Sequence, residues 1–244
     1  RADFDQAVAD LGLPCIVKPA TFSAGHGHTV IRGEGEVDAA WDNARGDGDD
    51  VMVERFVDFD SEITLLAVRS VDPATGKLAT WFCEPIGHIN HDGRLLESWQ
   101  PTALSPAALD NARSMAARIS NALGGRGVFA VEMFVSGDDV YFSGVTPRPH
   151  DVATVTLSSQ RFSQYDLHAR AVLGLPIDTT LVSPGACTML YGPVNDLAAA
   201  LAVPEADVRL YRDERAMVLV TAETVDSARS RAAQASEAAT RSIG

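Results

Sequence analysis

The chain has 244 residues, 46% of them hydrophobic and 22% charged, and is therefore long and apolar enough to bury a core in one large domain or two modest ones. Its formal net charge of −13 argues against binding to nucleic acid or anionic membranes through bulk charge, so any phosphate ligand needs a local site. Three widely separated cysteines give no disulfide framework, and no apolar run approaches the roughly 20 residues that span a bilayer. We expect a globular protein of the reducing cytoplasm that binds neither nucleic acid nor membrane.

The N-terminal part predicts a helix followed by a β-hairpin. The chain begins at Arg1 without an initiator methionine and enters a helix over residues 5–11 almost at once, which is typical of a fragment of a longer protein. Residues 15–18 predict an apolar strand, a glycine-rich loop follows to His28, and residues 29–31 return as a second strand. The next predicted elements are a helix over residues 37–44 and strands over residues 51–54, 62–68 and 78–83.

The clearest predicted helix lies in the middle of the chain. Ser105 is its N-cap, Pro106 occupies the first helical position, and Gly124 ends it. Later elements are strands over residues 128–135 and 140–145, joined by a tight turn, and a helix over residues 164–173.

The pattern of elements changes beyond residue 174. Strands are predicted over residues 181–191, 208–211 and 217–221, and helices over residues 196–201 and 225–241. Because strands and helices do not alternate regularly and several connections are short, the class is α+β with antiparallel sheets. We expect a domain of residues 1–174 followed by a small α+β domain of residues 175–244.

Lys18 stands at a strand end beside a loop that contains Gly25 and Gly27. Glycines let backbone N–H groups approach an anion and a lysine adds charge, so this arrangement suits phosphate. By itself, the pattern fits an ordinary glycine hairpin with a solvated lysine better.

Glu132 lies inside an otherwise apolar predicted strand. An unpaired buried carboxylate is costly, so this residue needs a partner. One interpretation is a salt bridge, for example to Arg148, and the other is a magnesium ion, which takes carboxylate ligands beside substrate phosphates.

Several separated stretches, taken together, resemble one enzyme family. Residues 127–135 and 141–151 are similar to the metal-binding end of ATP-grasp enzymes, specifically the formate-dependent phosphoribosylglycinamide formyltransferases. The resemblance covers essentially the whole chain and is tightest over residues 12–28, 51–66, 97–101 and 124–151. It implies an ATP-grasp fold without the family's N-terminal domain.

The resemblance implies a nucleotide site in the first third of the chain. Lys18 would touch the phosphates and Glu62 the ribose hydroxyls. The loop residues implied to close over the phosphates are Ser23, Ala24, Gly25, His26, Gly27 and His28, and those implied to hold the adenine are Glu54, Arg55, Phe56 and Val57. His26 stands where the family has a lysine, so the loop brings less positive charge to the phosphates.

The same resemblance implies that Glu132 binds Mg²⁺, with Gly144 at the position of the family's second metal carboxylate. Asp151 would contact the amine substrate, and Arg148 would contribute to catalysis beside it. The family's adjacent arginine pair for the substrate phosphate is missing, which leaves Arg212 and Arg215 as partial replacements.

The implied reaction uses ATP and formate to formylate glycinamide ribonucleotide in purine synthesis, and the implied assembly is a homodimer of the full-length protein. Two alternatives stay open. One is a non-catalytic nucleotide-binding relative, favoured by His26, Gly144 and the altered substrate loop. The other is an ATP-grasp ligase that joins a different carboxylate and amine, favoured only by the altered substrate loop.

Four histidines offer no metal-binding spacing on a helix. His88 and His91 are expected in a loop rich in glycine and aspartate, and we interpret them, with His150 and His168, as structural or surface groups.

Overall fold

The computed structural model describes residues 1–20, 27–46, 50–91 and 94–241. The chain divides into two compact units. The smaller contains residues 1–58 and 90–94, and the larger contains residues 59–89 and 95–244. Each unit is described by itself.

The smaller unit is a three-stranded antiparallel sheet with two helices. Its strands run in the order β2 (Thr29–Ile31), β1 (Cys15–Pro19), β3 (Val51–Arg55), and its helices are α1 (Ala2–Leu11) and α2 (Val37–Arg45), the latter preceded by the 3₁₀ turn η1 (Glu34–Glu36). Cys15 and Val17, two residues apart on β1, both point into the core, as strand geometry requires. Phe4 and Trp41 close that core with ring centroids 5.0 Å apart. The predicted hairpin of the first two strands is confirmed.

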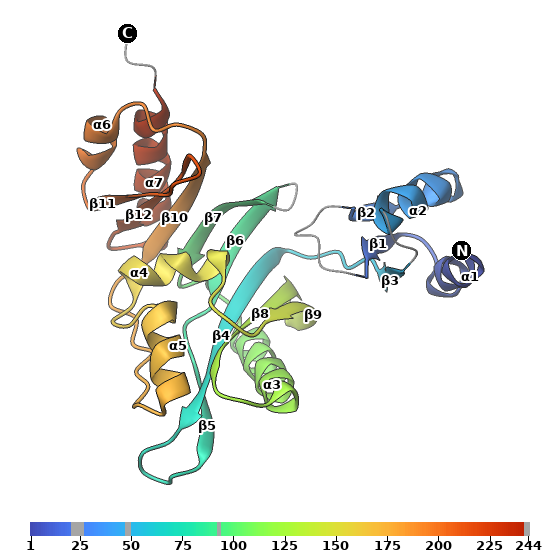
Figure 1. The fold of residues 1–244 in the computed structure, drawn as a ribbon, viewed down its shortest axis with the longest axis horizontal. Helices are drawn as coiled ribbons and strands as arrows, with labels where there is room; N and C mark the ends of the chain where they lie inside the picture. Colours follow the sequence, from blue (N-terminus) through green and yellow to red (C-terminus); the bar gives the residue numbers. More distant parts are fainter. Residues whose placement is uncertain (21–26, 47–49, 92–93, 242–244) are drawn as a thin grey trace. The chain divides into compact units, whose positions relative to one another are not determined.

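The larger unit is built on a nine-stranded sheet (Figure 1). Its strand order is β11-β12-β10-β7-β6-β4-β8-β9, and β5 pairs with β4. The strands are β4 (Ser61–Val71), β5 (Leu78–Phe82), β6 (Ile86–His91), β7 (Arg94–Gln100), β8 (Gly127–Ser136), β9 (Asp139–Thr146), β10 (Gly185–Tyr191), β11 (Ala206–Leu210) and β12 (Arg215–Thr221).

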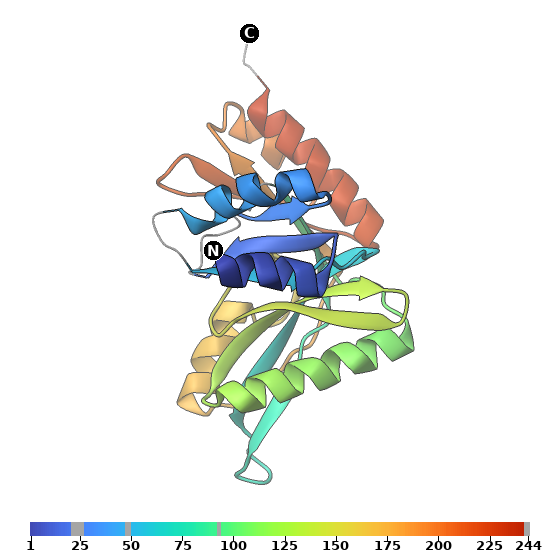
Figure 2. The same ribbon diagram turned by 90° about the vertical axis from the view of Figure 1, so that its right-hand side faces the viewer.

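Helices cover both faces of the β4 and β8 region. Ile63 and Leu65 of β4 pack with helix α3 (Pro106–Leu123), whereas Leu66 and Val68 pack with helix α5 (Gln164–Leu173). Figure 2 shows α3 running alongside β8 and β9. The alternation follows from the two-residue period of a strand, and it places the even-numbered residues of β4 and β8 on the α5 face.

Both helices begin where their capping residues predict. The Ser105 hydroxyl accepts a hydrogen bond from the Ala108 N–H, with Pro106 in the first turn of α3. Ser163 and Asp166 form a reciprocal capping box at the start of α5. The loop between β9 and α5 contains η2 (Asp151–Val155) and α4 (Thr156–Ser159).

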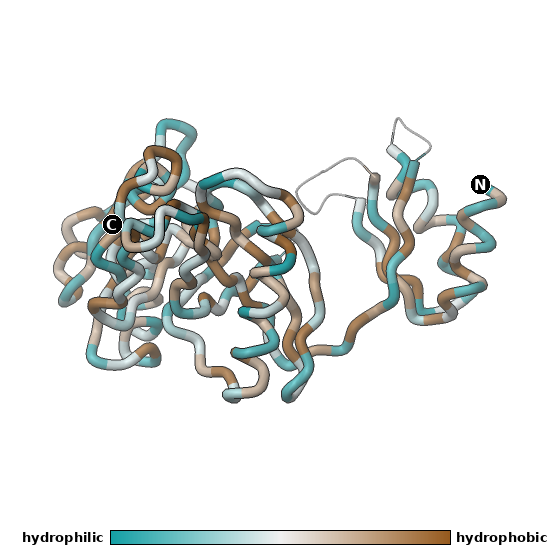
Figure 3. The backbone as a smooth tube through the Cα atoms, turned by 90° about the horizontal axis from the view of Figure 1, so that it is seen from below, coloured by the Kyte–Doolittle hydropathy of each residue, from teal (hydrophilic) through white to brown (hydrophobic). Residues whose placement is uncertain are grey.

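The last part of the chain adds β10, β11 and β12 to the same sheet, with helices α6 (Leu197–Leu201) and α7 (Val225–Thr240). Strand β10 pairs directly with β7, in the register Gly185 with Gln100. Alanines of α7 pack on the buried valines of β12. In both units, apolar and hydrophilic stretches alternate along the chain (Figure 3). The boundary expected at residue 174 stays a prediction.

Two predictions about local structure are wrong. The segment that contains His88 and His91 is strand β6 rather than a loop, and β7 follows it. The strand predicted from Leu181 begins only at Gly185, and Leu181 forms an isolated bridge with Gln160. Among the described helices, none is long and apolar enough to cross a membrane.

Candidate functional site

A group of polar side chains interrupts the apolar α5 face of the larger sheet. Glu62 and Thr64 lie on β4, and Thr64 is paired with Glu132 on β8. All three are even-numbered and therefore share the face of the buried Leu66 and Val68. Strand periodicity and the pairing of β4 with β8 thus place two carboxylates at the same end of one face of the sheet. They are Glu62, predicted to bind the ribose, and Glu132, predicted to bind the metal.

His88 on β6 adds an imidazole to this group, with a side chain that is 0% exposed. Its Nε2 lies 3.1 Å from the Thr64 hydroxyl, and its Nδ1 lies 3.6 Å from Glu62 Oε2. Burial lowers the pKa of His88 to about 4, opposed in part by a hydrogen bond with the backbone of Ile63. The ring is therefore neutral at pH 7.

His150 is the residue that approaches Glu132. Its Nε2 lies 3.5 Å from Glu132 Oε1, and both side chains are about one-fifth exposed, at 22% and 23%. The buried Gln164 holds the His150 backbone at both ends, since its amide accepts from the N–H and donates to the C=O, each at 2.8 Å. Arg148, the partner suggested from sequence, is exposed and donates instead to the Pro149 carbonyl.

Gly144 lies directly opposite Glu132 in the pairing of β8 with β9. Ser143 is the extra residue of a β-bulge at this point. A Cβ atom added at Gly144 would meet only Glu132 Oε2, at 4.0 Å. The position therefore has room for a side chain directed at Glu132.

Glu132 fits magnesium as a single carboxylate ligand, a mode in which water and substrate phosphates complete the coordination. Among the described residues, no group of three or more His, Cys, Asp or Glu side chains is arranged to hold a metal. Thr146, two residues after Gly144 on the same strand, shares its face. Asp151 is exposed at the start of η2.

In the smaller unit, Lys18 on β1 forms an ion pair with Glu54 on β3. The Lys18 side chain is 15% exposed, so its ammonium is already partly removed from water. Burial lowers the pKa of His28, and the positive charge of Lys18 lowers it further. Three of the predicted nucleotide-binding residues are thus close together, whereas Ser23, Ala24, Gly25 and His26 lie outside the described residues.

Position 27 requires glycine, both for its backbone conformation and for the atoms that surround it. Its φ angle is +79°, a left-handed conformation that side chains disfavour. A Cβ atom would lie 2.8 Å from Pro19 Cγ and 3.1 Å from the Asn43 carbonyl oxygen. This glycine lets the end of the loop approach β1 and α2 closely.

The predicted adenine segment is at the end of β3, which is an outer strand of the small sheet among the described residues. Glu54 and Arg55 are the last residues of β3, and the Phe56 N–H donates to the Pro14 carbonyl at 3.4 Å. The Arg32 guanidinium lies 6.0 Å from the centre of the Phe56 ring. Val57 follows in irregular structure.

The predicted substrate residues come from two distant parts of the larger unit. Arg215 donates to Asp213 at 2.7 Å and lies 5.3 Å from the centre of the Tyr211 ring. The hydrogen bond to Asp213 raises the pKa of Arg215, and the negative charge of Asp151 raises it further, so Asp151 and Arg215 are within electrostatic range. Arg212 is exposed.

Tyr165 and Tyr211 were missed by sequence reasoning. Burial raises the pKa of both hydroxyls, and the charge of Asp151 adds to this effect in each case. Neither tyrosine lies in a motif, and only the fold brings them near Asp151.

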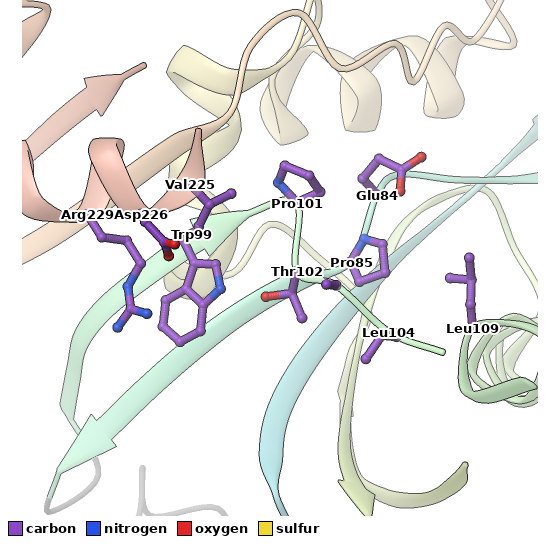
Figure 4. A pocket seen from close by; sticks show the side chains of 11 residues that line it. Glu84, Pro85, Trp99, Pro101, Thr102, Leu104, Leu109, Val225, Asp226 and Arg229 are labelled. Atoms are coloured by element: carbon purple, nitrogen blue, oxygen red, sulfur yellow. The ribbon is translucent and has the colours of Figure 1, made fainter. Parts of the chain in front are cut away.

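A cavity of about 570 Å³ lies elsewhere in the larger unit (Figure 4). Trp99, Thr102 and Pro85 form part of its wall, and helix α7 contributes Arg229. Arg229 donates two hydrogen bonds of 2.9 Å to Glu97 and lies 3.9 Å from the centre of the Trp99 ring. None of the residues predicted to bind nucleotide, metal or substrate lines this cavity.

The family model of the ATP-grasp domain matches residues 1–165. The chain belongs to the ATP-grasp family. Two curated relatives named formate-dependent phosphoribosylglycinamide formyltransferase, from Corynebacterium glutamicum strain R and Paraburkholderia xenovorans, are 54% and 50% identical to it over 97% and 95% of this chain. The chain spans 62% of the length of each of these relatives.

Solved structures give the same fold. The structure described as glycinamide-RNase-transformylase T from Mycobacterium tuberculosis is 41% identical, with a TM-score of 0.82, over 98% of this chain and 64% of that one. The N5-carboxyaminoimidazole ribonucleotide synthetase of Thermus thermophilus is 29% identical, with a TM-score of 0.84, over 98% of this chain and 66% of that one. The predicted α+β class and ATP-grasp fold are confirmed.

Proposed function

We propose that the protein containing this chain uses ATP and formate to formylate glycinamide ribonucleotide. The observation that carries the proposal is 54% identity, over 97% of the chain, to a relative named for this activity. The polar group formed by Glu62, His88 and Glu132 supports it, because carboxylates suited to a ribose and to a metal ion share one face of the sheet.

The proposal assigns residues of the chain to the separate parts of Mg-ATP. Lys18 and the loop from Ser23 to His28 bind the phosphates, and the segment from Glu54 to Val57 binds the adenine. Glu62 accepts hydrogen bonds from the ribose hydroxyls. A magnesium ion held by Glu132 neutralises charge on the phosphates when it is bound.

The proposed chemistry has two steps. A formate oxygen attacks the γ-phosphorus of ATP, which breaks the bond to ADP and gives formyl phosphate. The substrate amine then attacks the formyl carbon, inorganic phosphate leaves, and the nitrogen loses one proton.

Asp151 orients the attacking amine in this scheme, and Arg148 contributes charge beside it. Arg212 and Arg215 bind the substrate phosphate. By the same relationship, we propose that the full-length protein is a homodimer of the cytoplasm.

The test is product formation by the full-length protein supplied with formate, Mg-ATP and glycinamide ribonucleotide. Mass spectrometry should detect the formylated product, with one ADP formed per product. The proposal fails if no product forms, even after Gly144→Glu and His26→Lys are introduced together.

A non-catalytic, nucleotide-binding role is the second candidate, and Gly144 is the observation that favours it. This role predicts binding of an ATP analogue without turnover of ATP in the presence of any substrate amine. A ligase with a different carboxylate and amine would instead turn over ATP, and a screen of acceptor amines would identify its substrate.

A further inference from the structure

We propose that His88 is a positioning residue that orients Glu62 toward the sugar of the nucleotide, so that this site discriminates ribonucleotides from deoxyribonucleotides. The inference rests on the proposed nucleotide function and adds to it a residue that determines specificity. Sequence analysis interpreted His88 as a structural or surface group in a loop, and its position on β6 is what makes this role possible.

One imidazole ring contacts three successive residues of β4. Nδ1 lies 3.6 Å from Glu62 Oε2, the ring hydrogen-bonds with the backbone of Ile63, and Nε2 lies 3.1 Å from the Thr64 hydroxyl. The pairing of β4 with β6 sets these contacts, since Ile63 is opposite Gly87. His88 therefore fixes the backbone from which the Glu62 side chain extends.

The ring acts as a neutral group. Its surroundings are Glu62 and Thr64 on β4, Glu132 on β8 opposite Thr64, and His150 after β9. Burial, together with the nearby His150, holds the pKa of His88 at about 4. A neutral ring has one N–H and one acceptor nitrogen, so one ring nitrogen donates a hydrogen bond and the other accepts one.

Glu62 keeps its capacity to accept hydrogen bonds in this arrangement. A distance of 3.6 Å is longer than a hydrogen bond, and a carboxylate offers about four lone-pair sites. Its side chain is 20% exposed, so it is held by its neighbours and still reaches solvent. Two adjacent hydroxyls of a ribose match the two oxygens of a carboxylate held in a single orientation.

The expected discrimination follows from the loss of one hydrogen bond to a charged acceptor. Removing the 2′-hydroxyl should weaken binding about 10- to 100-fold when Glu62 is held in place. When Glu62 is free to rotate, the ribonucleotide loses this advantage, whereas binding of the 2′-deoxynucleotide changes little. We therefore expect the affinity for the ribonucleotide, relative to that for the 2′-deoxynucleotide, to fall when His88 is replaced.

The experiment is calorimetric titration of a nonhydrolysable ATP analogue and of its 2′-deoxy counterpart into the full-length protein and four variants, one of which, Glu62→Gln, removes the charge of the proposed acceptor. His88→Leu removes the polar contacts at similar volume, and His88→Asn retains an N–H near the position of Nδ1. His91→Leu is the matched control, because His91 is exposed on the same strand. Thermal unfolding of each variant checks that it is folded.

The dissociation constant of the 2′-deoxy analogue divided by that of the ribonucleotide analogue should fall to within about threefold of unity in His88→Leu. This ratio should stay near the wild-type value in His88→Asn and His91→Leu. An unchanged ratio in His88→Leu overturns the inference. If His88→Leu does not fold, Glu62→Gln decides instead, and an unchanged ratio in that variant overturns the inference. Failure of the wild-type protein to bind either analogue overturns the proposed nucleotide function itself, and this inference with it.

Discussion

Glu132 on β8 and Gly144 on β9 are opposite residues of an antiparallel pair, and a Cβ atom at Gly144 would lie 4.0 Å from Glu132 Oε2. A carboxylate at position 144 would therefore face that of Glu132 across the two strands. The site as it stands presents one carboxylate where a pair fits.

Gly144→Glu should complete a two-carboxylate site. Mg²⁺-dependent binding of a nonhydrolysable ATP analogue should become tighter by about tenfold or more, because the ion gains a charged ligand. Without Mg²⁺, the facing carboxylates repel each other and the melting temperature should fall. Calorimetry with and without Mg²⁺ measures the first effect, and the neutral Gly144→Gln is its control. Equal Mg²⁺ dependence in the Glu and Gln variants would contradict the expectation.

Lys18→Ala should weaken binding of the same analogue by about 10- to 100-fold, which is the loss of one charge-assisted hydrogen bond. The change also leaves the partly buried Glu54 without its ion-pair partner. Lys77→Ala is the matched control, because Lys77 is the other lysine of the chain and lies exposed after a turn. Calorimetry at low and high salt measures the effect, and similar losses in both variants would argue against a role for Lys18.

His88 predicts a pH dependence of folding stability. Its pKa of about 4 in the folded protein lies below the ordinary value of 6.5, so the unfolded chain binds the extra proton first as the pH falls. The stabilising contribution is present above about pH 6.5 and is lost as the pH falls toward about 4, by at most about 1.4 kcal/mol per pH unit.

Denaturant unfolding between pH 4 and 8 should therefore show a shallower slope in His88→Leu than in the wild type. Carboxylates titrate in both proteins, so the difference between the two curves isolates the imidazole. Parallel curves would mean that His88 is not held neutral.

Gly27→Ala should destabilise the smaller unit by about 1–3 kcal/mol, because a side chain is strained at this φ angle and meets Pro19. Gly33→Ala is the control, since its φ is −145° and an added Cβ atom meets no atom within 4 Å. Hydrogen exchange of the β1 amides resolves the effect. Equal protection in the two variants would show that the close approach at Gly27 costs little.

Arg229→Ala should lower the free energy of unfolding by about 1.5–3 kcal/mol, because two hydrogen bonds to Glu97 and the contact with Trp99 are lost. This corresponds to a fall in melting temperature of roughly 3–12 °C for a domain of this size. Arg209→Ala removes an exposed pair with Asp207 and should change stability by less than about 0.5 kcal/mol. A double-mutant cycle with Glu97→Ala should give a coupling energy well above zero.

The sequence was a good guide wherever one local rule decides the structure. Ser105 and Pro106 predict the start of α3 because capping acts within four residues, and runs of mostly aliphatic and β-branched residues predict β4 and β8. Strand β6 was missed because His88 is buried through contacts with β4 that no local pattern encodes, while Asn90 and His91 on the same strand are exposed.

The candidate site shows the same division. Glu62 and Glu132 stand out in the sequence because carboxylates in apolar strands need partners. The contact of His150 with Glu132 depends on Gln164, fourteen residues further along, which holds the His150 backbone at both ends. Tyr165, in helix α5, and Tyr211, just after β11, come within electrostatic range of Asp151 only through the fold.

The pairing of β10 with β7 limits which C-terminal segments could replace the present one. Arg215 begins β12, which pairs with β10, and β10 in turn pairs with β7 in a register that places Thr188 opposite Glu97. An exchange of the segment from β10 to α7 between relatives would have to preserve this register. It would also have to preserve the hydrogen bond that Arg229 donates to Glu97. A replacement of the whole C-terminal segment therefore has to match strand β7, whereas a point substitution at Arg212 does not.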